Sequence, residues 1–229
     1  MTDLREVVLD TETTGLDYKQ GDRIIEIGCI ELINKIKTGN FFHSYINPKR
    51  KVGEAALNIH GISNEFLVDK PLFSDIAKDF AEFIKDSVLV IHNAKFDIGF
   101  INNEFFLAGM PKISMSGIVD TLLLARQKYP GSPANLDALC KRFNVNLDKR
   151  DKHGALIDSE LLAMVYVELV GGKQTKFNFQ STNSQISNKT ANITNFPHRK
   201  FSLSKSEEMS RQDLLKDLPS PIWNKCSIN

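Results

Sequence analysis

Four carboxylates stand at positions where the neighbouring sequence is apolar. Asp10 follows the apolar run 7–9, and Glu12 lies two residues further on, so both side chains point to one face of an extended chain. Asp97 and Asp158 each begin a helical stripe whose later positions are mainly apolar. These stripes continue through Phe100, Ile101, Phe105 and Ala108 after the first acid, and through Leu161, Leu162, Val165 and Leu169 after the second. The pattern places four acids at the edges of buried faces.

Each of these residues has an ordinary explanation when it is taken alone: a surface turn for Asp10 and Glu12, a helix start for Asp97, a solvated loop for His153. Together they favour a metal site, because an unpaired buried charge is costly and divalent cations compensate converging carboxylates. Oxygen ligands without a cluster of cysteines or histidines indicate two Mg²⁺ or Mn²⁺ ions rather than Zn²⁺. Two such ions about 3.5–4 Å apart activate water and stabilise the leaving oxygen of a phosphodiester. His153, five residues before Asp158, suits the removal of a proton from that water, since an ordinary histidine pKa is about 6.5.

The elements that position these residues follow from the hydrophobic periodicity. We expect strands over 6–9, 23–34, 41–46, 88–91 and 118–121, with the second and third joined in a hairpin by a turn at 37–40. Helical spacing covers 71–84, 95–107, 135–143 and 155–169. A three-stranded meander followed by alternating helix and strand predicts an α/β fold with a mixed five-stranded sheet flanked by helices. The four acids then converge at one end of this sheet.

Composition and charge exclude several classes of protein. The chain has 229 residues, of which 41% are hydrophobic and 25% charged, which rules out a collagen-like, disulfide-scaffold or wholly disordered chain. No apolar run is long enough to span a membrane, and three distant cysteines indicate reduced thiols in a cytoplasmic protein. Residues 1–175 carry a net charge of −3 and residues 176–229 a net charge of +4. The acidic body argues against a protein that grips nucleic acid by bulk charge.

The C-terminal part of the chain differs from the body. Residues 180–195 contain 12 Ser, Thr, Asn or Gln residues out of 16, a composition that predicts a flexible linker. Residues 196–229 are again partly apolar but too few to form an independent core. We therefore expect this segment to fold on a partner.

Three short motifs carry a resemblance to a known family. The run Asp10–Gly15 (DTETTG) resembles the first motif of the DEDDh 3′–5′ exonucleases, Asn93–Asp97 the second, and His153–Asp158 the third in its histidine form. All three occur in order, and the resemblance covers about residues 5–172. It is closest to the proofreading subunits of bacterial replicative polymerases. The resemblance implies a ribonuclease H-like fold, an exonuclease domain over 1–173, and activity on the 3′ end of DNA.

The resemblance also implies roles for single residues. Asp10 would bind both metals, and Glu12 and Asp158 would bind the metal that holds the attacking water. Asp97 would orient a metal-bound water or ligand, and His153 would be the general base. Substrate contacts would come from Asp10, Glu12 and Asp158, and from Thr13, Leu16, Ala55 and His60.

Three of these substrate contacts have separate tasks. Thr13 would hold the terminal 3′-hydroxyl, Leu16 would pack on the last base, and His60 would approach the terminal nucleotide. Close relatives often carry an acid at the position of Ala55, whereas here Glu54 is one place away. Any contact between this position and the substrate is therefore made by the backbone, or is shifted to a neighbouring residue.

Two further stretches extend the resemblance beyond the catalytic body. Residues 174–179 are similar to a sliding-clamp-binding pattern, in which Gln174, Phe177 and Phe179 are the binding positions. The segment 196–229 resembles the part of the proofreading subunit that docks on the polymerase subunit. Its candidate anchors are Met209, Leu214, Leu215, Leu218 and Trp223. A small third core subunit is a further candidate partner.

The function expected from these observations is removal of mispaired 3′-terminal nucleotides as 5′-monophosphates within a replicative polymerase complex. An RNA-directed exonuclease of the same superfamily would use identical catalytic residues, but has no evident need of the tail. A non-catalytic assembly module would retain only the fold. The complete set of four acids and a histidine argues against this alternative. The chain is too short for a polymerase of the usual architecture.

Overall fold

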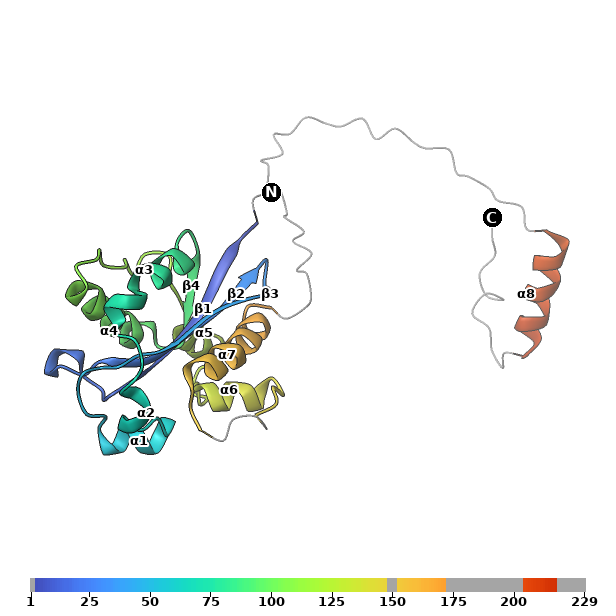
Figure 1. The fold of residues 1–229 in the computed structure, drawn as a ribbon. Coiled ribbons are helices and arrows are strands. Elements are labelled where there is room, and N and C mark those ends of the chain that lie inside the picture. Colours follow the sequence, from blue (N-terminus) through green and yellow to red (C-terminus); the bar gives the residue numbers. More distant parts are fainter. Residues whose placement is uncertain (1–2, 148–151, 172–203, 218–229) are drawn as a thin grey trace, which may run out of the picture. The chain divides into compact units, whose positions relative to one another are not determined.

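The computed structural model describes residues 3–147, 152–171 and 204–217 (Figure 1). They belong to two units, which divide between residues 178 and 179. The first is a body with a central sheet, and the second contains a single described helix, α8 (Lys205–Asp217). No helix among the described residues is long and apolar enough to cross a membrane.

A mixed five-stranded sheet forms the centre of the body, as the sequence predicts. Its strands are β1 (Arg5–Thr13), β2 (Ile24–Ile33), β3 (Ile36–Tyr45), β4 (Val88–Ile91) and β5 (Val119–Asp120). Their spatial order is β3-β2-β1-β4-β5. The β1–β2 and β2–β3 pairs are antiparallel, whereas β1–β4 and β4–β5 are parallel. The central strand β1 therefore lies between β2 and β4 and carries the first two acids of the site.

The hairpin between β2 and β3 is confirmed, but its turn was placed wrongly at 37–40. The chain reverses at Asn34 and Lys35, whose φ angles of 51° and 69° form a tight two-residue loop. Gly39, with a φ of 92°, lies inside β3, where the ladder with β2 changes register. Its left-handed backbone marks a bulge and not a turn. The first strand is also longer than predicted, because β1 pairs with β2 as far as Thr13.

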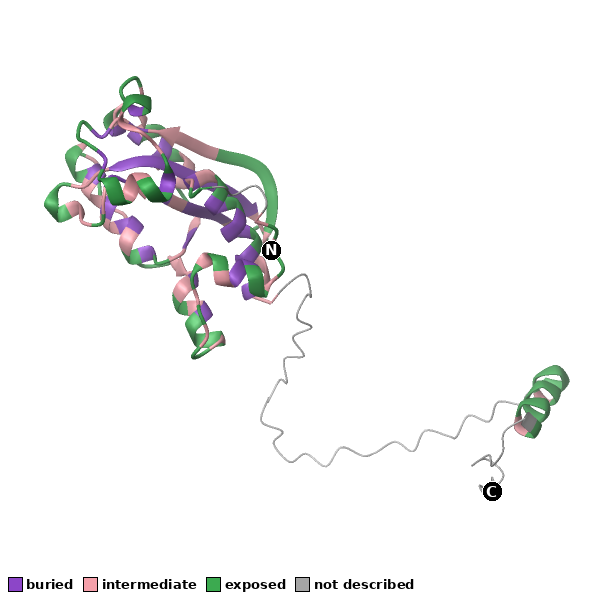
Figure 2. Cartoon of the chain, turned by 90° about the horizontal axis from the view of Figure 1, so that it is seen from below, coloured by how far each residue is buried: buried purple, intermediate pink, exposed green. Residues whose placement is uncertain are grey.

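Eight helical segments cover the sheet and the loops around it in the described body. The predicted helices correspond to α3 (Phe73–Ile84), α4 (Ala94–Leu107), α6 (Leu136–Arg142) and α7 (Ala155–Leu169). Four short segments were not predicted: η1 (Tyr18–Gln20), α1 (Glu54–His60), α2 (Asn64–Leu67) and α5 (Thr121–Lys128). Figure 2 shows buried residues along the strands and on the helix faces turned toward them, whereas α8 is almost wholly exposed.

The two faces of the sheet carry different helices. Val7 and Leu9 of β1 belong to a core cluster with α3 and α4, whereas Val8 belongs to a second cluster with α7. Because side chains alternate along a strand, Asp10 and Glu12 face the α7 side and Thr11 faces the α4 side. The described cysteines, Cys29 and Cys140, are buried and form no disulfide.

Candidate active site

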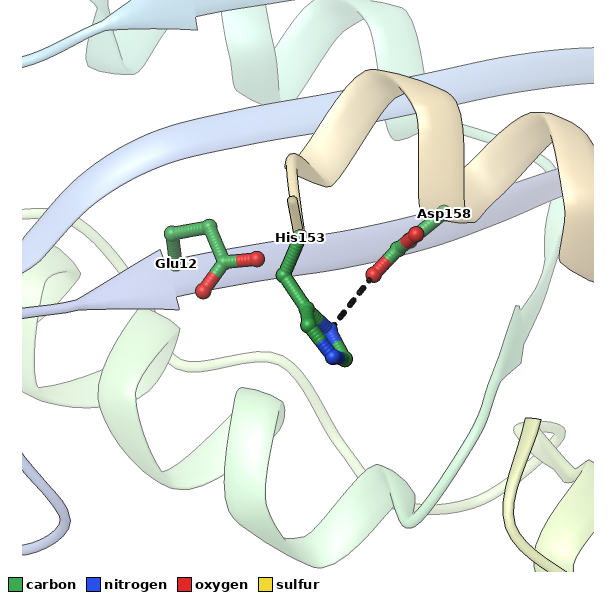
Figure 3. A group of neighbouring side chains, drawn as sticks. All are labelled: Glu12, His153 and Asp158. Carbon is green, nitrogen blue, oxygen red and sulfur yellow. Dashed lines mark hydrogen bonds and ion pairs between the residues drawn. The ribbon is translucent and has the colours of Figure 1, made fainter. Parts of the chain in front are cut away.

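The end of β1 and the start of α7 bring three of the predicted residues together. Figure 3 shows the carboxylates of Glu12 and Asp158 on either side of the His153 ring. One ligand atom of each residue lies within 4.8 Å of the others. His153 Nδ1 lies 3.1 Å from Asp158 Oδ2, and Asp158 is 3% exposed in the first turn of α7. The helix dipole favours a negative charge at this end of α7.

Asp97 reaches the site from the other face of the sheet. It lies in the first turn of α4, is buried, and its Oδ1 accepts a hydrogen bond of 2.7 Å from the Thr11 hydroxyl. Asp120 fixes the start of the same helix, since its carboxylate accepts from the backbone N–H groups of Asn93 and Ala94. Burial raises the pKa of Asp97 to about 7, although the Thr11 hydrogen bond acts in the opposite direction.

Asp10 lies where the negative charges converge. Loss of solvation raises the pKa of Asp10 well above its ordinary value, and the charges of Asp97, Glu12, Asp158 and Glu26 raise it further. A strongly raised carboxylate pKa beside several other carboxylates is typical of a functional site. The structure thus brings Asp10, Glu12, Asp97 and Asp158 to one end of the sheet.

The donor set of this cluster fits a divalent cation. Glu12 and Asp158 offer carboxylate oxygens, and His153 offers one ring nitrogen within the same small volume. Hard oxygen donors of this kind bind hard divalent cations, which neutralise the repulsion that raises the pKa of Asp10. DEDDh exonucleases are metal-dependent enzymes as a family, and the residues present here are compatible with that chemistry.

A groove beside the carboxylates contains the remaining predicted substrate positions. Thr13, Leu16, Ala55 and His60 all line a cavity of about 220 Å³. The side chain of Leu16 is 83% exposed at its edge, whereas His60, the last residue of α1, is buried. Glu54 does not line this cavity. The Thr13 hydroxyl donates to the carbonyl of Gly15 at 2.6 Å, which shapes the turn after β1.

Only part of the predicted C-terminal machinery lies among the described residues. Met209 and Leu214 are exposed on α8 and Leu215 is partly exposed. Leu218 and Trp223 lie outside the described residues, as do the clamp-binding positions Gln174, Phe177 and Phe179 and the linker 180–195.

Sequence reasoning missed several residues that shape the site. Thr11 orients Asp97, and Ile59 and Phe96 line the groove. Glu26 is the most informative omission, because it is a buried acid within the apolar run of β2. A charge flanked by Ile25 and Ile27 was a signal that could have found it, since buried charges need partners.

Comparison with known proteins agrees with the fold and the site. A family model described as exonuclease matches residues 7–166. A solved structure of Exonuclease X in complex with 5′ overhanging duplex DNA is 27% identical, covers 72% of this chain and 90% of its own, and has a TM-score of 0.56. The nuclease domain of 3′hExo, a DEDDh family member bound to rAMP, covers 72% of this chain and 91% of its own with a TM-score of 0.63; at 17% identity it shows the fold alone.

Fold, motifs and carboxylate cluster together define an exonuclease of the DEDDh type. The DNA polymerase III subunit epsilon of Rickettsia felis is 55% identical over 85% of this chain and 86% of that protein. The corresponding subunit of Buchnera aphidicola from Acyrthosiphon pisum is 42% identical over 96% of this chain and 98% of its own length. That of Salmonella typhimurium is 47% identical over 76% of this chain and 74% of its own length. The chain belongs to the family of DNA polymerase III epsilon subunits.

Proposed function

We propose that this chain is the proofreading 3′–5′ exonuclease of DNA polymerase III, which removes mispaired 3′-terminal nucleotides of DNA as 5′-monophosphates. The observation that carries the proposal is the convergence of four carboxylates and His153 beside an open groove. The names of the relatives support the assignment to the replicase, and the bound DNA of the Exonuclease X structure supports DNA as the substrate class.

The four acids would hold two divalent cations, Mg²⁺ or Mn²⁺. Asp10 would bind both, Glu12 and Asp158 would bind the one that holds the attacking water, and Asp97 would orient a metal-bound water or ligand. When bound, such ions lower the pKa of the attacking water and stabilise the leaving oxygen. Burial raises the pKa of Asp10 most, and repulsion between the carboxylates raises it further, so cations would offset both effects.

His153 removes the proton of the attacking water. His153 Nδ1 lies 3.1 Å from Asp158 Oδ2. The N–H group at Nδ1 then donates a hydrogen bond to that carboxylate, and Nε2 keeps the lone pair that accepts the proton of the water. The side chain of His153 is 46% exposed, so water can reach its ring. A general base needs a correct tautomer within reach of its proton, and Asp158 supplies the orientation.

The groove selects a strand end by its shape and not by reading the base. Leu16 and Ile59, 83% and 52% exposed, offer apolar surface to a terminal base, and Thr13 and His60 lie deeper. A mispaired end enters more readily, because it has already lost its pairing energy and unstacked bases bind apolar platforms. The phosphodiester of the last nucleotide then faces the carboxylates.

Affinity comes largely from tethering within the replicase. We assign residues 1–173 to the exonuclease, 174–179 to sliding-clamp binding, 180–195 to a linker and 196–229 to docking on the polymerase subunit, in the cytoplasm. The exposed Met209 and Leu214 of α8 support the last assignment. A tethered partner acts at an effective concentration in the millimolar range, so the body itself needs no basic surface.

The decisive assay compares four 3′-labelled substrates with one enzyme preparation: a paired DNA primer, the same primer with a 3′ mismatch, single-stranded DNA and single-stranded RNA. Proofreading predicts faster release of the terminal nucleotide from the mismatch and from single-stranded DNA than from the paired end. Faster degradation of RNA than of DNA would instead support an RNA-directed exonuclease. No release from any substrate by folded protein would support an assembly module.

A further inference from the structure

A fifth acid lies beside the site without belonging to the predicted metal ligands. Glu26 is directly opposite Glu12 in the β1–β2 ladder and is 2% exposed. Its charge contributes to the raised pKa of Asp10, so it lies near the four carboxylates. Such a buried carboxylate destabilises the fold unless it forms compensating hydrogen bonds.

One oxygen of this carboxylate caps α7. Glu26 Oε2 accepts a hydrogen bond of 3.1 Å from the backbone N–H of Ala155, the first residue of the helix. The N-cap residue of α7 is Gly154, which has no side chain to accept this bond. The strand β2 therefore supplies the cap that the helix lacks in its own sequence.

Two further contacts hold β2 against the start of α7. The hydroxyl of Ser159 donates to the carbonyl of Gly28 at 2.8 Å. A Cβ at Gly28 would lie 2.3 Å from the carbonyl carbon of Ala155, so only glycine permits this approach. The helix start thus lies directly on the strand that carries Glu26.

The other oxygen of the carboxylate is fixed from β3. Glu26 Oε1 lies 2.8 Å from Nε2 of His43, and the His43 ring contacts Tyr45 edge-on at 4.9 Å. With both oxygens held by protein groups, the orientation of the Glu26 carboxylate is set before substrate arrives. This arrangement differs from that of a metal ligand, whose oxygen must face the ion.

We infer that Glu26 is a positioning residue, which anchors the start of α7 so that His153, two residues before Ala155, meets the attacking water. The inference rests on the proposed function, since it assigns the role of general base to His153. His153 directly precedes Gly154, the N-cap residue of α7, so the capped helix start restrains its backbone. A displacement of about 1 Å at a catalytic group can reduce the rate about 100-fold.

The anchoring itself is tested without any activity, by amide hydrogen exchange of the full chain. Glu26→Ala removes the acceptor, and the Ala155 amide should exchange at least 10-fold faster than in the wild type. Glu26→Gln keeps an oxygen acceptor and should leave exchange within about 3-fold. Glu31→Ala is the matched control, because it removes a buried acid of the same strand that bonds instead to Arg5, Thr38 and Asn40. Unchanged exchange at Ala155 in Glu26→Ala would overturn the anchoring.

The link to catalysis is tested by a double-mutant cycle with His153→Ala. Glu26→Ala should lower kcat about 10- to 100-fold with KM within about 3-fold, whereas Glu26→Gln should lose at most about 3-fold. In the His153→Ala background, Glu26→Ala should cost less than 2-fold more, because the group that it positions is already gone. Positioning of His153 would be refuted if the losses of kcat in the two single variants multiply in the double variant. It would also be refuted if Glu26→Gln loses as much kcat as Glu26→Ala. If the wild type releases no nucleotide, the proposed function fails, and the exchange measurement still decides the anchoring.

Discussion

Replacement of Asp97 by asparagine should make the metal-free protein more stable while it impairs the enzyme. Asp97→Asn keeps the shape of the side chain and an oxygen that can accept the 2.7 Å hydrogen bond from Thr11. It removes a negative charge that is 3% exposed and lies near other carboxylates. If this charge serves metal binding, as proposed, the chain should be less stable in EDTA than its packing alone would allow.

The raised pKa sets the magnitude of this effect. A folded-state pKa of about 7 against an ordinary value of 3.8 corresponds to roughly 4 kcal/mol of destabilisation once the group is ionised. This figure is an upper bound, because the metal-free site relaxes and admits water. We expect Asp97→Asn to raise the free energy of unfolding in EDTA at pH 8 by about 1–4 kcal/mol, or several degrees in Tm.

The sign of the pH dependence provides a second check. Because the pKa is higher in the folded state, the folded chain binds the additional proton, and its stability falls as the pH rises between about 4 and 7. The advantage of Asp97→Asn should therefore be largest at pH 8 and shrink by about half or more at pH 5.

Chemical unfolding in EDTA at both pH values, repeated with Mn²⁺, measures all of these quantities. The exposed Asp79→Asn in α3 is the control and should change stability by less than about 0.5 kcal/mol. Saturating Mn²⁺ should stabilise the wild type more than Asp97→Asn. An asparagine variant that is less stable than the wild type in EDTA at pH 8 would refute the reasoning.

Four further outcomes follow from the same structure. Asp158→Ala should lower nucleotide release by about 10³-fold or more with an unchanged circular dichroism spectrum, and retained activity would remove this residue from the site. Gly28→Ala should destabilise the fold by about 1–3 kcal/mol in denaturant unfolding, because its Cβ meets the α7 backbone, and an unchanged midpoint would contradict the contact. Arg23→Ala should cost about 3–5 kcal/mol in the same measurement, since it leaves Glu104, 1% exposed, without its two 2.6 Å bonds; a loss below 1 kcal/mol would count against this. Deletion of 196–229 should preserve nuclease activity and abolish co-purification with the polymerase subunit, which a truncated chain that still co-purifies would disprove.

The acids of the site were accessible from the sequence for a simple geometric reason. Strand alternation placed Asp10 and Glu12 on one face, and the helical stripe placed Asp97 and Asp158 at buried helix starts, all of which are local properties. His153 was different, because no periodicity distinguishes a histidine in a loop. Its role came from the motif that it shares with the exonuclease family.

The features that the sequence did not reveal depend on distant contacts. The hydrogen bond between Glu26 and Ala155 joins residues 129 positions apart, so no local sequence pattern predicts it. The sequence predicts a turn around Gly39 because glycine favours turns. In the structure, Gly39 instead lies in a bulge of the β2–β3 ladder. The short helix α1 was missed because its seven residues carry no clear apolar stripe, although its end is marked by Gly61 in a left-handed conformation.

The most direct test of the central claim is release of 5′-monophosphate from the 3′ end of a DNA primer by the purified full chain. Wild type, Asp10→Ala and His153→Ala are compared with Mg²⁺, with Mn²⁺ and with EDTA. We predict release by the wild type with either ion and none in EDTA, none above background for Asp10→Ala, and a greatly reduced rate for His153→Ala. Undiminished release in EDTA, or by Asp10→Ala, would show that the carboxylate cluster is not the catalytic site.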